Sequence, residues 1–114
     1  MKYLILNLLL WAVPLLSFAQ TDCVDAIYVC GNSNFSGLTA TGFGIQEIDE
    51  SNACTSKEHN TLWFKIKIKN GGTLGLIIKP ENDDLVVDLD FWIYGPNVSC
   101  GSLGMPIRCS TTNP

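Results

Sequence analysis

Apolar and polar side chains alternate along three segments of this chain, and this period of two constrains the fold more than any other feature. Apolar residues occupy every second position of residues 61–69, and the pattern recurs in residues 73–79 and 86–94. Successive side chains of a β-strand point to opposite faces of the sheet, so the alternation predicts strands with one buried face. The side chains predicted to face inward are Leu62, Phe64, Ile66, Ile68, Leu74, Leu76, Ile78, Leu89, Phe91 and Ile93.

Turn-forming residues separate these strands. Asn70-Gly71-Gly72 predicts a hairpin, because glycine reaches positive φ angles at little cost. Residues 80–84 are turn formers that end the second strand. Shorter strands are expected at residues 24–30, 36–41, 45–48 and 105–110, with a mostly polar loop over residues 46–60. Short strands separated by turns predict an all-β fold, an antiparallel β-sandwich or jelly roll.

The N-terminus has the layout of a secretory signal peptide. A short basic start precedes the apolar residues 4–16, and Ser17-Phe18-Ala19 ends in a small-x-small pattern. The apolar run is shorter than the roughly 20 residues of a membrane span. We therefore predict a cleaved signal peptide at residues 1–19 and one secreted or cell-surface module at residues 20–114, with no membrane span in the mature chain.

The predicted mature chain is acidic. The whole chain has 7 Lys and Arg against 11 Asp and Glu, and removal of Lys2 with the leader leaves six against eleven, a net charge of −5. Affinity for nucleic acid comes largely from neutralising phosphates, so nucleic acid is not an expected partner. Anionic membrane surfaces are disfavoured for the same reason. An extracellular protein or a glycan is the expected partner.

All five cysteines lie in the predicted exported part, where disulfides form. Cys100 and Cys109 flank a glycine-rich turn and are one candidate pair; Cys30 and Cys54 are another. Connectivity does not follow from spacing, and an odd number leaves one thiol unpaired. A zinc site is disfavoured because the chain has no Cys-x-x-Cys pair and His59 is its one histidine.

No arrangement of residues typical of nucleophilic catalysis stands out. His59, the one histidine available as a base, lies in a polar stretch, and no Gly-x-Ser-x-Gly elbow occurs. We therefore predict that the chain is not an enzyme.

Four acidic side chains form a candidate calcium site: Glu47, Glu58, Asp88 and Asp90. Asp88 and Asp90 share one face of a predicted strand, and the two glutamates bracket a loop that can fold over them. Calcium is bound by roughly six to eight oxygen atoms, which carboxylates and carbonyls supply. The alternative is that the aspartates pair across the sheet with lysines of residues 65–69.

Trp63, Trp92 and Tyr94 share the polar parity of their strands and form a candidate ligand-binding platform. Aromatic rings beside polar groups suit stacking against sugars. The alternative is that the rings pack under a covering loop or a second sheet, since tryptophan is mostly buried on average.

Several strings of the mature chain are informative in their order. They are Asp22-Cys23, Val29-Cys30-Gly31-Asn32, Gly42-Phe43-Gly44-Ile45-Gln46-Glu47, Glu58-His59-Asn60-Thr61-Leu62-Trp63-Phe64, residues 88–101 and Ile107-Arg108-Cys109-Ser110-Thr111. In this order they resemble the N-terminal region of surface proteins of gliding bacteria, which usually end in a gliding-motility-associated or type IX secretion sorting domain. The Trp-Phe and Asp-x-Asp-Phe strands resemble, more distantly, pre-peptidase C-terminal and CUB-like β-sandwiches.

The resemblance implies a sandwich that continues past residue 114, so we expect the module to be truncated at its C-terminal end. It implies no catalytic residues. The expected function is a non-catalytic extracellular or cell-surface adhesion or recognition module of a longer secreted protein. The alternatives are an accessory β-sandwich of a secreted protease or hydrolase, and a calcium-dependent carbohydrate-binding module.

Overall fold

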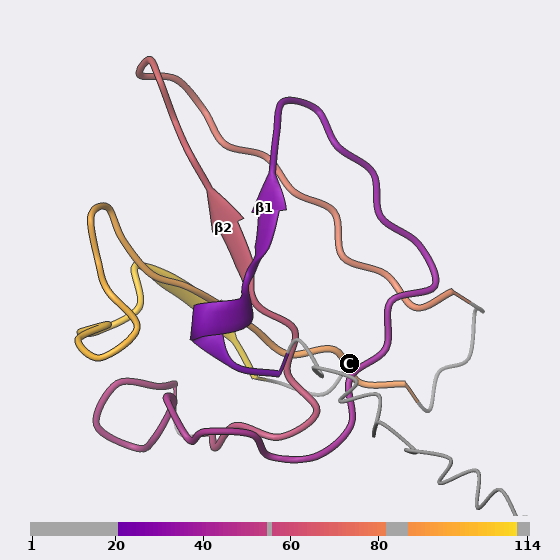
Figure 1. Ribbon diagram of the computed structural model, residues 1–114, viewed down its shortest axis with the longest axis vertical. Helices are drawn as coiled ribbons and strands as arrows, with labels where there is room; N and C mark the ends of the chain where they lie inside the picture. Colours follow the sequence, from indigo (N-terminus) through magenta and orange to yellow (C-terminus); the bar gives the residue numbers. More distant parts are fainter. Residues whose placement is uncertain (1–20, 55, 82–86, 112–114) are drawn as a thin grey trace, which may run out of the picture.

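The computed structural model describes residues 21–54, 56–81 and 87–111, so the predicted signal peptide lies outside the described residues. In chain order the elements are a 3₁₀ helix η1 (Cys23–Asp25) and the strands β1 (Ile27–Val29), β2 (Phe64–Ile66), β3 (Phe91–Ile93) and β4 (Arg108–Ser110) (Figure 1). The described part is thus β-rich with little helix. None of its helices has the length and apolar character that crossing a bilayer requires.

The four strands form two separate two-stranded sheets. β1 and β2 are parallel, with Ile27 opposite Phe64. β3 and β4 are antiparallel, with Phe91 opposite Ser110. The antiparallel prediction is therefore correct for the second sheet and wrong for the first. The chain between β1 and β2 is long enough for the crossover that parallel strands need. A full antiparallel sandwich is not confirmed.

The predicted hairpin at Asn70-Gly71-Gly72 is only partly formed. The chain reverses direction there, but the returning residues 73–79 are not a strand (Figure 1). A tight two-residue hairpin turn of the favoured kind needs positive φ at one or both central residues. Among the described residues, those with positive φ do not include Asn70, Gly71 or Gly72. The two limbs therefore splay, and the predicted strand over residues 61–69 shortens to β2.

The buried side chains are mostly not those that the alternation predicted. Leu62, Phe91 and Ile93 are half-buried. The other predicted inward residues are at least 39% exposed, namely Phe64, Ile66, Ile68, Leu74, Leu76, Ile78 and Leu89. The buried residues are Thr21, Ile48, Ala53, Glu58 and Leu103. The predicted polar loop thus supplies much of the core of the described residues, because the Tyr94–Asn52 hydrogen bond and the Cys54–Cys109 disulfide hold it against β3 and β4.

Two disulfides hold these parts together. Cys23 of η1 pairs with Cys100, with a Cα–Cα distance of 5.5 Å, and Cys54 pairs with Cys109 of β4 at 6.3 Å. Cys30 is an exposed free thiol. The expected pairs Cys30–Cys54 and Cys100–Cys109 are therefore wrong. The β3–β4 register places Cys109 opposite a residue of β3 rather than near Cys100, and Cys30 follows the end of β1.

Removing the longer disulfide tests this connectivity. We expect the double variant Cys23→Ala/Cys100→Ala to lose about 4 kcal/mol of unfolding free energy, because its disulfide joins residues 77 positions apart and restricts the unfolded chain. Urea denaturation of the secreted protein, followed by circular dichroism, measures the loss. Cys30→Ser is the matched control and should leave the midpoint unchanged. Peptide mapping that finds Cys30 in an intramolecular disulfide would contradict the structure.

Candidate functional site

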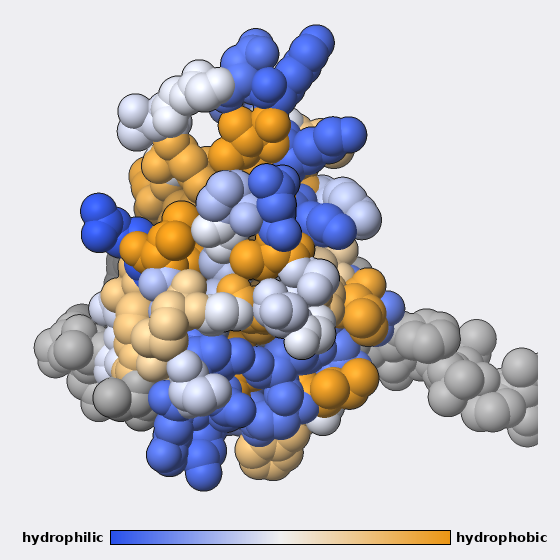
Figure 2. Space-filling view, turned by 90° about the vertical axis from the view of Figure 1, so that its left-hand side faces the viewer, coloured by the Kyte–Doolittle hydropathy of each residue, from blue (hydrophilic) through white to orange (hydrophobic). Residues whose placement is uncertain are grey.

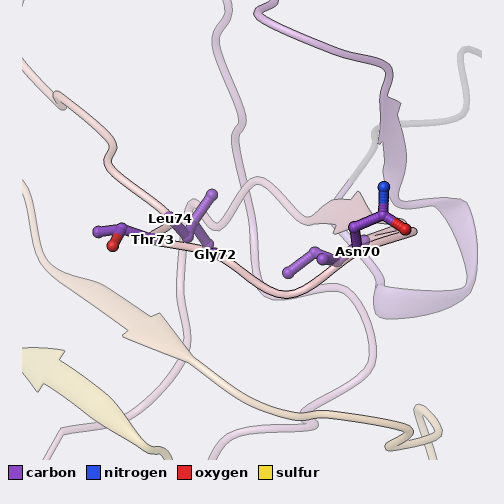
Figure 3. A pocket seen from close by; sticks show the side chains of 5 residues that line it. Asn70, Gly72, Thr73 and Leu74 are labelled. Atoms are coloured by element: carbon purple, nitrogen blue, oxygen red, sulfur yellow. The ribbon is translucent and has the colours of Figure 1, made fainter.

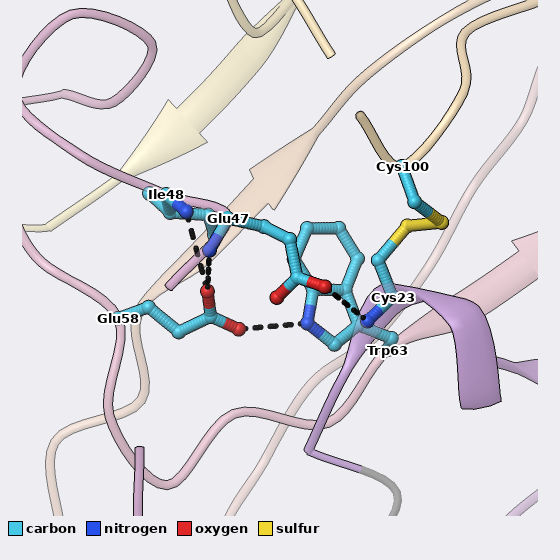
Figure 4. Close-up of a disulfide and its surroundings, with 6 residues drawn as sticks. All are labelled: Cys23, Glu47, Ile48, Glu58, Trp63 and Cys100. Carbon is cyan, nitrogen blue, oxygen red and sulfur yellow. Dashed lines mark hydrogen bonds between the residues drawn. A yellow bond between two sulfur atoms is a disulfide. The ribbon is translucent and has the colours of Figure 1, made fainter. Parts of the chain in front are cut away.

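A buried carboxylate, Glu58, lies at the centre of the best-connected group of polar residues. Its side chain is 1% exposed. Oε2 accepts hydrogen bonds from the backbone N–H groups of Glu47 at 2.9 Å and Ile48 at 3.2 Å, and Oε1 accepts one from the indole Nε1 of Trp63 at 2.7 Å (Figure 4). A buried charge is costly unless hydrogen bonds compensate it. These three donors explain why Glu58 is stable in the interior.

Polar side chains hold the loop in the shape that presents these donors. The Gln46 amide donates to the carbonyls of Ile48, at 2.8 Å, and of Glu58, at 3.3 Å. The Asn52 amide donates to the carbonyl of Glu47 at 2.8 Å. Buried backbone groups need partners, and these side chains provide them where no strand neighbour does. The polar side chains of Gln46 and Asn52 in the predicted loop thus form hydrogen bonds within the loop.

Trp63 and Tyr94 pack together over this loop. Their ring centroids are 6.2 Å apart with an interplanar angle of 27°. The Tyr94 hydroxyl donates to the carbonyl of Asn52 at 2.8 Å. Burial, then the charges of Glu58 and Asp49, raise the pKa of Tyr94 to about 12. Both rings are half-buried and have their polar atoms bonded to the loop, which favours packing over a displayed sugar platform.

Trp92 does not join this pair. Among the described residues, no ring contact links it to Trp63 or Tyr94. Its indole Nε1 is buried and has no hydrogen-bond partner in that part of the chain. The predicted platform of three aromatic rings is therefore reduced to one stacked pair, with Trp92 apart on β3.

Glu47 is a second, less buried carboxylate beside Glu58. Its Oε1 accepts a hydrogen bond from the backbone N–H of Cys23 at 3.1 Å, which fixes η1 against the loop. Its Oε2 is buried without a partner in the described part of the chain. Burial raises the pKa of Glu47, and the nearby charges of Glu58 and Asp22 raise it further, against the lowering effect of the Cys23 bond. Glu47 and Glu58 therefore repel one another when both are ionised.

Asp22 fixes the start of the described chain by a hydrogen bond next to Gly44, a position that only glycine can occupy. Its Oδ1 accepts a hydrogen bond from the backbone N–H of Ile45 at 2.6 Å. Gly44 just before has φ +55°, and a Cβ there would collide with the Asp22 carboxylate. Glycine alone satisfies both the backbone conformation and the close approach.

The four carboxylates predicted to bind calcium are not brought together. Asp90 lies near Asp88 and His59: burial and the charge of Asp88 raise its pKa, and His59 acts in the opposite direction. Across residues 21–54, 56–81 and 87–111, no three His, Cys, Asp or Glu side chains are grouped as a metal site requires. Within the described residues, Glu47 and Glu58 therefore do not form one metal-binding group with Asp88 and Asp90. A calcium site made from all four is not formed by this geometry.

The alternative pairing of the aspartates with lysines of residues 65–69 is not seen among the described residues either. Within the described ranges the ion pair is Lys57–Glu50, at 4.0 Å, with side chains 72% and 80% exposed. Exposed pairs contribute little to stability. A hollow of about 390 Å³ lies at the same place, lined by Asp49, Glu50, Ser51 and Lys57. It contains none of the predicted site residues.

Comparison with protein-family models, with curated proteins and with solved structures gives no match. The resemblance to surface proteins of gliding bacteria therefore stays a prediction.

Three residues of this region were missed by the sequence analysis: Cys23, Gln46 and Asn52. A local signal exists for Asn52, because Asp49-Glu50-Ser51-Asn52 is a typical turn sequence, closed by a bond from the Asn52 N–H to the Asp49 carbonyl at 3.2 Å. Cys23 has no comparable signal, since its disulfide partner is 77 residues away in sequence. Gln46 bonds to Ile48, two residues away, and to Glu58, 12 residues away.

Replacing Glu58 by glutamine tests its structural role. We expect Glu58→Gln to lower the free energy of unfolding by about 2 kcal/mol, because the amide group turns one acceptor into a donor that faces other donors. Urea denaturation at neutral pH measures the change. Glu50→Gln, at an 80% exposed side chain, is the matched control. Equal stability of Glu58→Gln and the control would contradict the central role of Glu58.

The pH dependence of stability tests the raised pKa of Glu47, which burial causes first and the charges of Glu58 and Asp22 increase further. A carboxyl whose pKa is raised by folding holds its proton more tightly in the folded state, so stability falls as pH rises from the ordinary value of 4.5 through the folded-state pKa. Glu47→Gln keeps the acceptor for Cys23 and removes this loss. We expect the variant to be the more stable protein at neutral pH, with the difference shrinking below pH 4.5. A difference that grows on acidification would refute this assignment.

Proposed function

We propose that this chain is a non-catalytic extracellular or cell-surface module that recognises a protein partner in adhesion. The observation that carries the proposal is an exposed surface on residues 64–79, which we name the lysine arm. Its apolar residues Ile68, Ile77 and Ile78 are 64%, 91% and 51% exposed. Contiguous exposed apolar surface is typical of interaction sites. Figure 2 shows apolar and hydrophilic surface interleaved at the upper end of the molecule, where the arm lies in Figure 1.

Three of the residues that suggested other chemistry, Glu58, Trp63 and Tyr94, have structural partners, which supports the proposal. The three hydrogen bonds to Glu58 occupy a carboxylate that would otherwise be a candidate acid or base. The stacked pair Trp63 and Tyr94 is tied to the loop beneath it. Phe64 of the lysine arm contacts Phe35, with ring centroids 5.5 Å apart, whereas Ile68, Ile77 and Ile78 are more than half exposed.

Two disulfides support an extracellular setting. Cys23–Cys100 and Cys54–Cys109 connect segments that share few buried apolar side chains. Disulfides persist in oxidising compartments and stabilise small domains whose cores are limited. Together with the export signal predicted at residues 1–19, they fit a module that works outside the cytosol.

Adhesion by cells that produce the full chain tests the proposal. We expect the exported protein to begin at Gln20 and the cells to attach to surfaces or to one another. Ile68→Ser/Ile77→Ser should reduce attachment without unfolding the module, because both side chains are exposed. Ile45→Ser, at a 59% exposed side chain outside the arm, is the matched control.

Cell counts after flow and the sedimentation of suspended cells measure attachment, and N-terminal sequencing measures cleavage. Unchanged attachment in cells that lack the protein would overturn the adhesive function. Retention of the uncleaved chain inside cells would overturn the extracellular one.

A further inference from the structure

Two exposed segments of the chain are complementary in charge and in pattern. The lysine arm contains Lys65, Lys67, Lys69 and Lys79 and no Asp or Glu, although the chain as a whole is acidic. Residues 87–90, which we name the aspartate segment, alternate two acids, Asp88 and Asp90, with Val87 and Leu89. Val87 is 40% and Leu89 43% exposed, and Ile66 and Ile68 of the arm are 39% and 64% exposed. Each segment therefore presents one apolar and one charged face.

The fold keeps these two segments apart within one molecule. β2 of the lysine arm pairs with β1, whereas the aspartate segment leads into β3, which pairs with β4 in the other sheet. In the part of the chain that the structure describes, no ion pair joins the lysines to Asp88 or Asp90. The edge of β2 away from β1 has no neighbouring strand there. The complementary surfaces are thus both available to a partner.

The backbone of the arm indicates what kind of partner fits. Residues 68–79 make no hydrogen bond to another described residue. Unpaired backbone groups disfavour burial in lipid, where nothing satisfies them. An extended peptide that adds to a strand edge supplies those hydrogen bonds and seats alternate side chains. The arm therefore suits a polypeptide strand with acidic side chains on one face.

A small hollow at the tip of the arm fits the same kind of partner. It has a volume of about 110 Å³ and is lined by Ile68, Asn70, Gly72, Thr73 and Leu74 (Figure 3). Pockets for drug-sized ligands have about 300–1,000 Å³. The hollow is therefore suited to a single side chain, such as an apolar residue of an added strand.

We propose that the partner is a second copy of this chain, with the lysine arm of each copy bound to the aspartate segment of the other. The chain itself carries an acidic segment with the alternating pattern that the arm fits, and reciprocal exchange satisfies both contacts about one two-fold axis. The inference rests on the proposed recognition function and names its partner. Asp88 and Asp90 repel one another in the free chain, so the lysines of the second copy also relieve that repulsion.

Reversing the charges of the lysine arm or of the aspartate segment by substitution tests the proposal. The full chain is secreted, purified and studied by sedimentation velocity in a Cys30→Ser background, so that no disulfide through the free thiol imitates the association. We expect a concentration-dependent dimer. Lys67→Glu/Lys69→Glu and Asp88→Lys/Asp90→Lys should each weaken it by about tenfold or more, because each places like charges in contact. Lys65 is left unchanged, since its Nζ lies 5.5 Å from the centre of the Tyr28 ring.

The decisive sample is an equimolar mixture of the two charge-reversed variants. In that mixture both contacts again join opposite charges, so we expect dimers to return. Lys57→Glu, a reversal at an exposed lysine outside the arm, is the control and should dimerise like the parent. Monomers at every concentration, or a mixture that does not recover, would overturn the proposal. So would lysine-dependent binding to phosphatidylglycerol vesicles by a chain that stays monomeric.

The two proposals fail in different ways. A monomeric chain whose cells still attach through Ile68 and Ile77 overturns the second-copy partner and keeps the recognition function. A chain that dimerises by charge exchange, but whose absence leaves cell attachment unchanged, keeps the association and overturns adhesion.

Discussion

The hydrogen bonding of the Glu58 carboxylate is the interaction on which the rest of the described structure depends. One oxygen is held by the loop backbone, and the other by the Trp63 indole. The carbonyl of Trp63 in turn accepts a hydrogen bond from Ile27 at the start of β1, at 2.8 Å, and the ring of Trp63 stacks on Tyr94 just after β3. One buried charge thus joins the loop to both sheets. A protein with so few buried apolar side chains depends on this polar connection and on its two disulfides.

The same arrangement places two carboxylates close together, which is unfavourable when both are ionised. Glu47 lies beside Glu58 with one oxygen bonded to the Cys23 N–H and the other unpartnered. Burial raises the pKa of Glu47, and the charge of the neighbouring Glu58 raises it further. The Cys23–Cys100 disulfide lies next to this pair and holds η1 against it (Figure 4). The disulfide therefore fixes the chain at the place where the carboxylates of Glu47 and Glu58 repel one another.

The residues around Glu58 stabilise the fold, whereas the lysine arm is the proposed recognition surface. Residues with recognisable chemistry are engaged in hydrogen bonds and stacking near Glu58. The arm pairs with β1 through β2, but Ile68, Ile77 and Ile78 are more than half exposed, so that part of its pattern is available for recognition. Its regular alternation of lysine and isoleucine is the pattern of a sheet strand, and a strand edge without a neighbour is a surface that other strands bind.

The alternation in sequence located β2 and β3, which lie within residues 61–69 and 86–94, and the weaker strand signals at residues 24–30 and 105–110 located β1 and β4. The strands predicted at residues 36–41, 45–48 and 73–79 are not formed. The predicted export, not the alternation, favoured disulfides, of which the described residues contain two. Trp63 and Tyr94 stack although β2 and β3 lie in different sheets, which was not the predicted arrangement. The alternation overestimated strand length and burial, since it reports which side chains share a face and not whether a second layer covers that face. The parallel pairing of β1 with β2, the partners of Cys23 and Cys54, and the burial of Glu58 were decided only by tertiary structure. Each of these depends on contacts between residues far apart in the chain, which no local pattern encodes.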